Sequence, residues 1–194
     1  MIAIIDYDAG NTFNVQKALQ HIGLDAVLTA DCDTILAADG VILPGVGAYA
    51  SAVSVLCERG LIEVIHEVVD RNIPLLGICL GMQLLFDESE EYGPTPGLGI
   101  IPGTVKAIPS DLGLRVPHMG WNQNTLCRKD SVFSDVADKY TYFVHSYYVD
   151  TDSQYITTTA DYGIQVPGIV EKGNVYGMQF HPEKSGSVGL DLLR

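Results

Sequence analysis

The chain has 194 residues, which is enough for one domain with a core of its own. An apolar share of 47% and a charged share of 18% exclude a disordered chain, and a net charge of −13 makes nucleic acid and anionic membranes poor partners. The four cysteines include no C-x-x-C pair, so we predict neither a disulfide framework nor a zinc site, and expect no metal.

The N-terminal run from Ile2 to Ile5 is apolar and β-branched, and it ends at Asp6. Because the run has no basic flank, it is predicted to be a buried strand rather than a signal peptide. No apolar run approaches the ~20 residues of a membrane span, so we expect a cytoplasmic protein.

Strand and helix signals alternate through the first half of the chain. Apolar residues at 15, 18, 19 and 22 form one stripe of a helix, and Gly23 stands where a helix end favours glycine. Strands are predicted at 2–5, 25–28, 41–43 and 73–78, and further helices at 48–59, 61–71 and 79–86. This alternation is typical of βαβ units with a parallel sheet.

After Tyr92 the sequence becomes rich in proline and glycine, with shorter strand signals. These signals lie at 104–108, 142–145, 155–160, 168–171 and 175–179, and residues 190–194 are predicted to end a short helix. The pattern favours hairpins and a meander. We therefore predict a single α/β domain over residues 1–194, with a mostly parallel central sheet flanked by helices and an antiparallel, strand-rich C-terminal half.

Cys79 is the clearest candidate for a catalytic nucleophile. It stands between a predicted strand and a predicted helix in the pattern G-x-C-x-G, the thiol version of a nucleophile elbow. The start of the helix offers N–H groups that stabilise a thiolate, and the N–H of Leu80 is predicted to bind a tetrahedral oxyanion. The alternative for Cys79 is a buried structural cysteine. Three further cysteines lack this setting and are interpreted as structural: Cys32, Cys57 and Cys127.

His181 is the candidate base for this thiol. It follows the predicted strand 175–179 and precedes Pro182, which disfavours helical geometry at His181. Since residues i and i+2 of an extended segment point to the same side, Glu183 is predicted to orient the imidazole as the third member of a triad. The alternative is a turn with a chance histidine. His21 and His66 lie on helical stretches and are not expected to take part.

A glycine-rich turn with Gly45, Val46 and Gly47 follows the predicted strand 41–43. It matches the dinucleotide fingerprint G-x-G-x-x-A, but it is not the first βα turn of the chain, and no acidic residue ends a strand ~20 residues later. We favour a second oxyanion donor, the N–H of Val46. The two glycines let the peptide between Gly45 and Val46 rotate, so this turn is also predicted to act as a switch. The alternative is a rigid turn whose glycines only pack tightly.

Two segments resemble the signatures of the triad, or class I, glutamine amidotransferases. They are Gly77-Ile78-Cys79-Leu80-Gly81-Met82-Gln83-Leu84-Leu85-Phe86 and Gln179-Phe180-His181-Pro182-Glu183-Lys184-Ser185. Residues 6–11, 44–49, 117–122 and 142–148 resemble the family of glutaminase subunits of imidazole glycerol phosphate synthases. The resemblance runs from Asp6 to about Leu193. Asp8 and Thr12-Phe13 depart from the family pattern near the first helix, without touching the triad.

The resemblance implies a role for each site residue. Cys79 attacks the carboxamide of glutamine, His181 activates the thiol and then protonates the leaving ammonia, and Glu183 orients His181. A glutamyl thioester forms, and water hydrolyses it to glutamate. The residues implied to hold glutamine are Gly47, Gln83, Ser146 and Tyr147. No metal or organic cofactor is implied.

The resemblance also implies a partner, a cyclase subunit built as a (β/α)8 barrel. Ammonia reacts there with a phosphoribulosyl aminoimidazole carboxamide nucleotide to give imidazole glycerol phosphate and an aminoimidazole carboxamide ribonucleotide, in histidine biosynthesis. We expect a one-to-one heterodimer in which Lys184 and Ser185, beside the triad, and the aromatic Trp121 and Tyr142 face the partner. For Trp121, a core position is an equal alternative.

Two other classes of protein stay open on the sequence. A non-enzymatic binding module on a similar fold predicts an unreactive Cys79. A cysteine hydrolase or peptidase would also have the elbow cysteine, but this function does not explain why His-Pro-Glu is followed by Lys-Ser at residues 181–185. Anthranilate, guanylate and carbamoyl phosphate glutaminases share the triad but lack the segments around Trp121 and His145.

Overall fold

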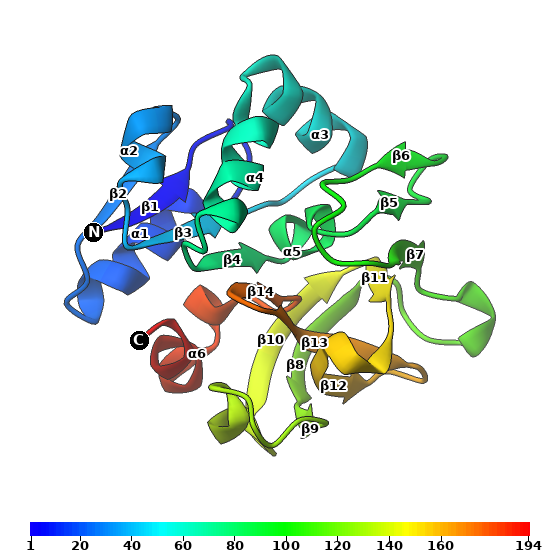
Figure 1. Ribbon diagram of the computed structural model, residues 1–194. Helices are drawn as coiled ribbons and strands as arrows, with labels where there is room; N and C mark the ends of the chain where they lie inside the picture. The colour runs from blue at the N-terminus through cyan, green and yellow to red at the C-terminus, as the bar shows by residue number, and fades with distance from the viewer.

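A computed structural model describes residues 1–194 apart from the side chain of Leu112. Among these residues the central sheet has eight strands, in the order β2-β1-β3-β4-β14-β13-β12-β9 (Figure 1). Neighbours from β2 to β14 are parallel, and those from β14 to β9 are antiparallel. In chain order the strands are β1 (Ile2–Ile5), β2 (Ala26–Thr29), β3 (Gly40–Leu43), β4 (Leu75–Ile78), β9 (Thr125–Leu126), β12 (Ile156–Asp161), β13 (Gln165–Lys172) and β14 (Val175–Met178).

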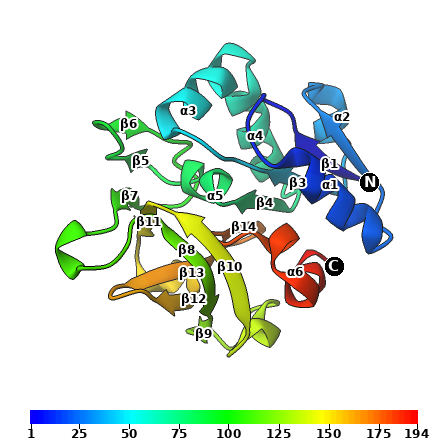
Figure 2. The same cartoon turned by 180° about the vertical axis from the view of Figure 1, so that it is seen from behind.

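Helices cover both faces of the parallel part of this sheet (Figures 1 and 2). The helices are α1 (Thr12–His21), α2 (Cys32–Leu36), α3 (Tyr49–Glu58), α4 (Leu61–Asp70), α5 (Leu80–Leu84) and α6 (Gly186–Leu193). One buried apolar cluster joins the sheet to α2, α3, α4 and α5, and a second joins it to α1 and α6. Strand β1 contributes to both, because Ala3 and Ile5 point to the first cluster and Ile4 to the second.

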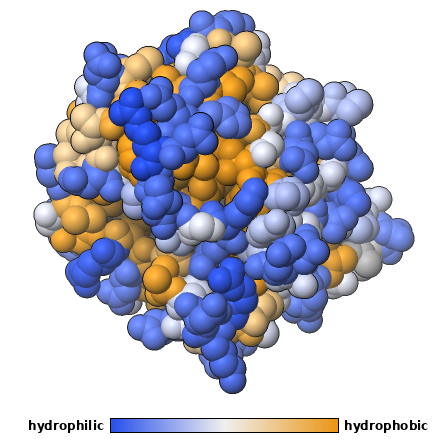
Figure 3. Space-filling view, in the orientation of Figure 1, coloured by the Kyte–Doolittle hydropathy of each residue, from blue (hydrophilic) through white to orange (hydrophobic). Residues whose placement is uncertain are grey.

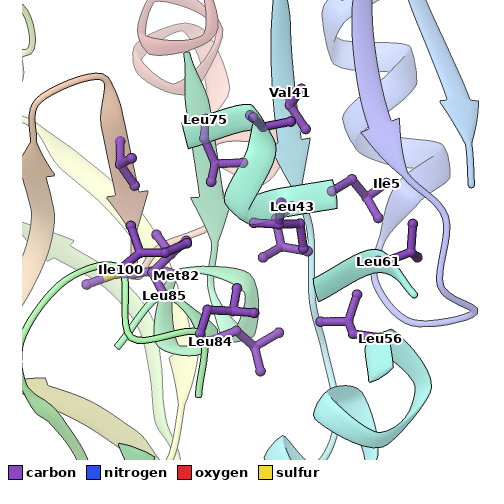
Figure 4. Packing of buried hydrophobic residues seen from close by; sticks show 14 of the residues in the cluster. Ile5, Val41, Leu43, Leu56, Leu61, Leu75, Met82, Leu84, Leu85 and Ile100 are labelled. Carbon is purple, nitrogen blue, oxygen red and sulfur yellow. The ribbon is translucent and has the colours of Figure 1, made fainter. Parts of the chain in front are cut away.

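The first cluster holds the helices firmly against the ends of the strands. Figure 4 shows Ile5 and Leu43 of the strands on the same side as Leu56 and Leu61 of the helices. All four side chains are 0% exposed. Burial of each contributes roughly 1.5–3 kcal/mol to folding, so this packing makes the carboxyl edge of the sheet a rigid base for the loops above it.

Two smaller sheets extend the C-terminal half. In the first, β10 (Tyr140–His145) pairs antiparallel with β8 (His118–Gln123). In the second, the strands lie in the order β11-β7-β5-β6. Their bounds are β5 (Glu88–Ser89), β6 (Thr95–Pro96), β7 (Thr104–Ala107) and β11 (Tyr147–Asp150). A third apolar cluster around Phe143 and Phe180 packs β10 on the antiparallel part of the central sheet.

The surface in the view of Figure 3 is largely hydrophilic, with apolar patches between the polar side chains. One apolar groove lies between the start of the parallel strands and α6, and is lined by Ile2, Leu24 and Leu193 among others. Among the described residues, no helix is long and apolar enough to cross a membrane.

The predicted α/β architecture is confirmed, and the errors concern element ends and several short elements. The strand predicted at 73–78 begins only at Leu75, and the helix predicted at 79–86 covers only Leu80–Leu84. The meander predicted in the C-terminal half is present as β12, β13 and β14. The sequence pattern misses α2, β5, β6, β8, β9 and β11. Strand β8 is a good example, since its sequence HMGWNQ contains no β-branched residue.

Candidate active site

Cys79 lies at the sharp turn between β4 and α5, as the elbow pattern predicts. Its backbone has φ 55° and ψ −112°, a strained conformation for a residue that is not glycine. The flanking glycines are required, because a Cβ on Gly77 would lie 2.6 Å from the Gly81 carbonyl oxygen, and a Cβ on Gly81 would lie 1.8 Å from the Leu43 carbonyl oxygen. Since α5 spans only five residues, the free N–H groups of its first turn stabilise a thiolate at Cys79 more than a helix dipole does.

The pairing of β4 with β14 brings His181 to this turn. Ile78 is the register partner of Met178, so Cys79 follows one strand where Gln179 follows the other, and the Cys79 N–H donates to the Met178 carbonyl at 2.7 Å. His181 comes two residues further along and is 2% exposed. The parallel pairing therefore places the nucleophile and the candidate base at one edge of the sheet.

Glu183 contacts His181 as predicted, but by a different local structure. Residues Pro182–Lys184 form a 3-10 turn, so the extended i, i+2 geometry assumed from the sequence is wrong beyond His181. Within this turn, Glu183 Oε1 lies 2.8 Å from His181 Nδ1. The Asn11 side chain donates to the same oxygen at 2.9 Å. Glu183 Oε2 is buried and has no hydrogen-bond partner among the described residues.

These contacts decide the charges of the pair. Burial opposes a charge on His181, but its hydrogen bonds with Cys79 and Glu183 outweigh this effect and raise its pKa to about 9. Burial likewise favours a neutral Glu183, but the hydrogen bonds from His181 and then Asn11 lower the pKa of its carboxyl group. At neutral pH the arrangement therefore favours an imidazolium between a carboxylate and the cysteine sulfur, which is how a thiol is activated as a nucleophile.

A cavity of about 470 Å³ opens over Cys79. Most of the residues predicted for the site line this cavity, which brings together segments from distant parts of the chain. The lining residues are Val46, Gly47, Cys79, Leu80, Gln83, Glu91, Tyr92, Val144, His145, Ser146, Tyr147, His181 and Lys184. Glu183 lies behind His181, and Trp121 lies outside the lining.

The glycine turn packs against the elbow at Gly45, whereas Val46 and Gly47 face the cavity. A Cβ on Gly45 would come within 2.7 Å of the Gly81 backbone nitrogen and 2.8 Å of the Tyr7 hydroxyl oxygen. The Tyr7 hydroxyl donates to the Pro44 carbonyl at 2.6 Å and so anchors the start of the turn. Gly47 has φ 100°, which only glycine adopts readily. This position beside Cys79 favours the oxyanion interpretation over a dinucleotide site.

Gln83 is fixed by two polar contacts that the sequence does not reveal. Its Nε2 donates to the Tyr147 carbonyl at 3.0 Å and to Gln179 Oε1 at 3.0 Å. Gln179 Nε2 in turn lies 3.8 Å from Cys79 Sγ. Because Gln179 and Asn11 each act on a site residue far away in sequence, only the three-dimensional structure identifies them. For Gln179 the available signal is its place as the first residue of the His181 signature.

The candidate interface residues differ in exposure. Trp121 is 56% exposed and packs edge to face with Tyr142 at 6.0 Å, so the core alternative for Trp121 is wrong. Lys184 is exposed at the rim of the cavity. Ser185 is only 1% exposed, and its hydroxyl bridges the His181 carbonyl and the Tyr142 N–H, so it supports the triad backbone rather than facing outward. The remaining cysteines are exposed and are not structural core residues: Cys32, Cys57 and Cys127.

Comparisons with known proteins agree with this geometry. The sequence model of the family described as "Glutamine amidotransferase class-I" matches residues 3–193. The chain is 54% identical over 193 residues to the imidazole glycerol phosphate synthase subunit HisH of Lactiplantibacillus plantarum, covering 100% of this chain and 93% of that one. It is 56% identical over 194 residues to HisH of Lacticaseibacillus casei, with the same coverage.

Solved structures show the same fold at low sequence identity. A structure titled "Crystal structure of glutamine amidotransferase" superposes with a TM-score of 0.78 at 19% identity, over 100% of this chain and 96% of that one. PurLQS of Thermotoga maritima superposes with a TM-score of 0.71 at 18% identity, over 99% of this chain and 94% of that one. The chain therefore belongs to the class-I glutamine amidotransferases and, within them, to the HisH family of imidazole glycerol phosphate synthase subunits.

Proposed function

We propose that the protein is the glutaminase subunit of an imidazole glycerol phosphate synthase. The observation that carries this proposal is the strained Cys79 with His181 in one cavity, and Glu183 behind His181, in a chain more than half identical to HisH proteins. The proposed reaction is hydrolysis of glutamine to glutamate and ammonia, for use in histidine biosynthesis in the cytoplasm.

In the first half of the proposed reaction, Cys79 Sγ attacks the carboxamide carbon of glutamine. The oxyanion that forms accepts hydrogen bonds from the backbone N–H groups of Leu80 and Val46. Collapse of this intermediate breaks the C–N bond, and His181 gives its proton to the departing nitrogen, which leaves as ammonia. In the second half, His181 takes a proton from water, the hydroxide attacks the glutamyl thioester, and glutamate is released from Cys79.

We assign glutamine to the cavity over Cys79. Gln83, the backbone at Ser146 and Tyr147, and Gly47 line it and offer polar groups at several points of its wall. Gly47 adds no side chain, so it leaves the approach to Cys79 open. The chemistry uses no cofactor in this scheme.

The proposed partner is a cyclase subunit built as a (β/α)8 barrel, bound one to one. Side chains along β8 and β10 point alternately to the two faces of the sheet. Those of Met119, Trp121 and Tyr140 point outward, with 61%, 56% and 54% of their surface exposed. Such an exposed apolar face next to the cavity rim and Lys184 suits a protein interface. Docking there would cover the cavity mouth and pass ammonia to the barrel without contact with bulk water.

The test is an assay of glutamate release from glutamine, with and without the barrel subunit and its nucleotide ligand. We expect weak release by the isolated chain and strong release by the complex with its ligand. Mass spectrometry after iodoacetamide treatment provides a second measurement, since a reactive Cys79 is labelled before the exposed cysteines. An unreactive Cys79 together with no glutamate release would instead identify a binding module.

A further inference from the structure

His118 and His145 form a buried pair behind the cavity, and the proposed reaction gives neither of them a role. They face each other across β8 and β10, are 3% and 6% exposed, and His118 Nδ1 lies 2.9 Å from His145 Nε2. His145 also lines the cavity over Cys79. A polar pair buried this deeply needs a consistent set of donors and acceptors.

The contacts at the two ends fix the direction of every hydrogen bond in the pair. The Tyr147 carbonyl lies 2.8 Å from His145 Nδ1 and can only accept, so His145 Nδ1 carries the hydrogen. A neutral His145 then accepts at Nε2, and His118 donates to it from Nδ1. His118 Nε2 is left as an acceptor for Asn122 Nδ2 at 3.3 Å, and the Asp161 carbonyl, 2.9 Å from that same nitrogen, fixes the orientation of the Asn122 amide.

The surroundings keep both rings neutral. Burial lowers the pKa of His118 to about 4, and its ring stacks between Phe143 at 4.9 Å and Tyr162 at 3.9 Å. Burial also lowers the pKa of His145 to about 3, against the opposing hydrogen bond to the Tyr147 carbonyl. At physiological pH the chain of hydrogen bonds therefore runs in one direction, from Asn122 to Tyr147.

The chain ends at the group that holds Gln83. The Tyr147 carbonyl accepts from both His145 Nδ1 and Gln83 Nε2. The second hydrogen of Gln83 Nε2 is used by Gln179 Oε1 at 3.0 Å. Both donor hydrogens of the Gln83 amide are thus engaged, which leaves its oxygen as the free polar atom of a side chain that lines the cavity.

We propose that His118 and His145 are positioning residues for glutamine, which hold the Tyr147 carbonyl in place so that Gln83 presents its amide oxygen to an N–H group of the substrate. This inference rests on the proposed function. The pair touches no reacting atom and acts through Tyr147 and Gln83. Its loss should therefore raise KM for glutamine more than it lowers kcat.

Two substitutions of His118 separate this role from simple packing. His118→Phe keeps an aromatic ring between Phe143 and Tyr162 but removes the donor to His145. His118→Asn keeps an amide N–H near the place of Nδ1 but loses the stacked ring. In the complex with the barrel subunit, we expect His118→Phe to raise KM for glutamine roughly five- to tenfold, as for one lost hydrogen bond, with kcat within about twofold and a smaller loss of Tm than in His118→Asn. His118→Asn should show the reverse, a KM near wild type and a lower Tm.

Phe143→Leu is the matched control, because it loosens the same stack without removing a hydrogen bond, and it should lower Tm without raising KM. KM values that rise in step with the loss of Tm across these variants would overturn the inference. Nitrogen NMR of the histidine rings in the wild-type chain gives a second reading, in which both rings should be neutral Nδ1–H tautomers from pH 6 to 8. An Nε2–H tautomer or a charged ring would also overturn it.

These outcomes are separable from failure of the proposed function. A wild-type complex that releases no glutamate refutes the proposed function, whereas NMR still reports on the histidine pair. A wild-type complex that is active, with an unchanged KM in His118→Phe, refutes only the positioning role.

Discussion

Asn11, at the start of α1, donates its side-chain N–H to Oε1 of Glu183 at 2.9 Å, across 172 residues of sequence. The same oxygen lies 2.8 Å from His181 Nδ1, so Asn11 helps to hold both the orientation and the charge of the carboxylate. We expect Asn11→Ala to lower kcat for glutamine hydrolysis about tenfold, because a hydrogen bond to a charged group contributes roughly 1.5–3 kcal/mol. Steady-state glutamate assays measure this effect.

A matched control for Asn11 lies on the same helix. Gln20 is exposed on α1, and Gln20→Ala should leave kcat unchanged. Equal kcat values for Asn11→Ala and Gln20→Ala would show that Glu183 is held adequately without Asn11.

Cys79→Ala should abolish glutamine hydrolysis, because alanine offers no nucleophile. The complex should still convert its nucleotide substrate when ammonia is added, since the proposed function assigns that step to the barrel subunit. Cys57→Ala, which changes an exposed cysteine on α3, should retain both activities. Normal glutamate production by Cys79→Ala would refute its assignment as the nucleophile.

Val46→Pro tests the second oxyanion donor. Proline removes the backbone N–H, and loss of one such donor lowers kcat by roughly 10²–10³. We expect this loss of kcat in the ligand-bound complex. The loss should be much smaller in the isolated chain, because the predicted switch turns the Val46 N–H away from Cys79 there. Val46→Ala keeps the N–H and should remain close to wild type. A fully active Val46→Pro complex would mean that the second donor lies elsewhere.

The buried histidines predict sensitivity of the fold to acid. Below about pH 6.5 the unfolded chain protonates His118, whereas the folded chain does so only near its lowered pKa of about 4. The unfolded state then binds more protons, so the free energy of unfolding falls as the pH drops from about 6.5 toward 4.

Urea unfolding at a series of pH values measures the slope of the free energy of unfolding against pH. His118→Phe should flatten it by up to about one proton, or ~1.4 kcal/mol per pH unit between pH 4.5 and 6. Phe143→Leu should lower stability at every pH without changing the slope. A wild-type slope in His118→Phe would contradict a neutral, buried His118.

Trp121→Ala should weaken binding of the barrel subunit by roughly 2 kcal/mol, as expected if this exposed aromatic residue is buried in the proposed interface. Titration calorimetry measures the affinity directly. Val132 is 75% exposed but lies beside α6, away from the cavity, so Val132→Ala is the control and should bind normally. Lys184→Ala should reduce the response to the cyclase ligand, since Lys184 stands at the cavity rim.

The sequence reveals those parts of the site that depend on local geometry. The glycines around Cys79 predict the elbow because a Cβ at either position would collide with nearby backbone. Alternating strand and helix signals likewise predict the parallel sheet. The contacts of Asn11 and Gln83 are not predictable in this way, because each depends on side chains from elements that meet only after folding.

The error at Glu183 has a similar cause. An i, i+2 pattern assumes one regular conformation, whereas the chain bends into a 3-10 turn after His181 because Pro182 starts it and α6 follows directly. The His118 and His145 pair is equally hidden, since β8 has no β-branched residue to mark it as a strand.

Adjacent pairing of β4 and β14 also has an evolutionary consequence. The alignment of these two strands brings Cys79 and His181 to the same edge of the sheet. Loops between α5 and β14 that contact neither the cavity nor the His181 backbone can therefore change in length without moving Cys79 and His181. Chains with this strand pairing can in this way differ in their outer loops while Cys79 and His181 keep the same positions.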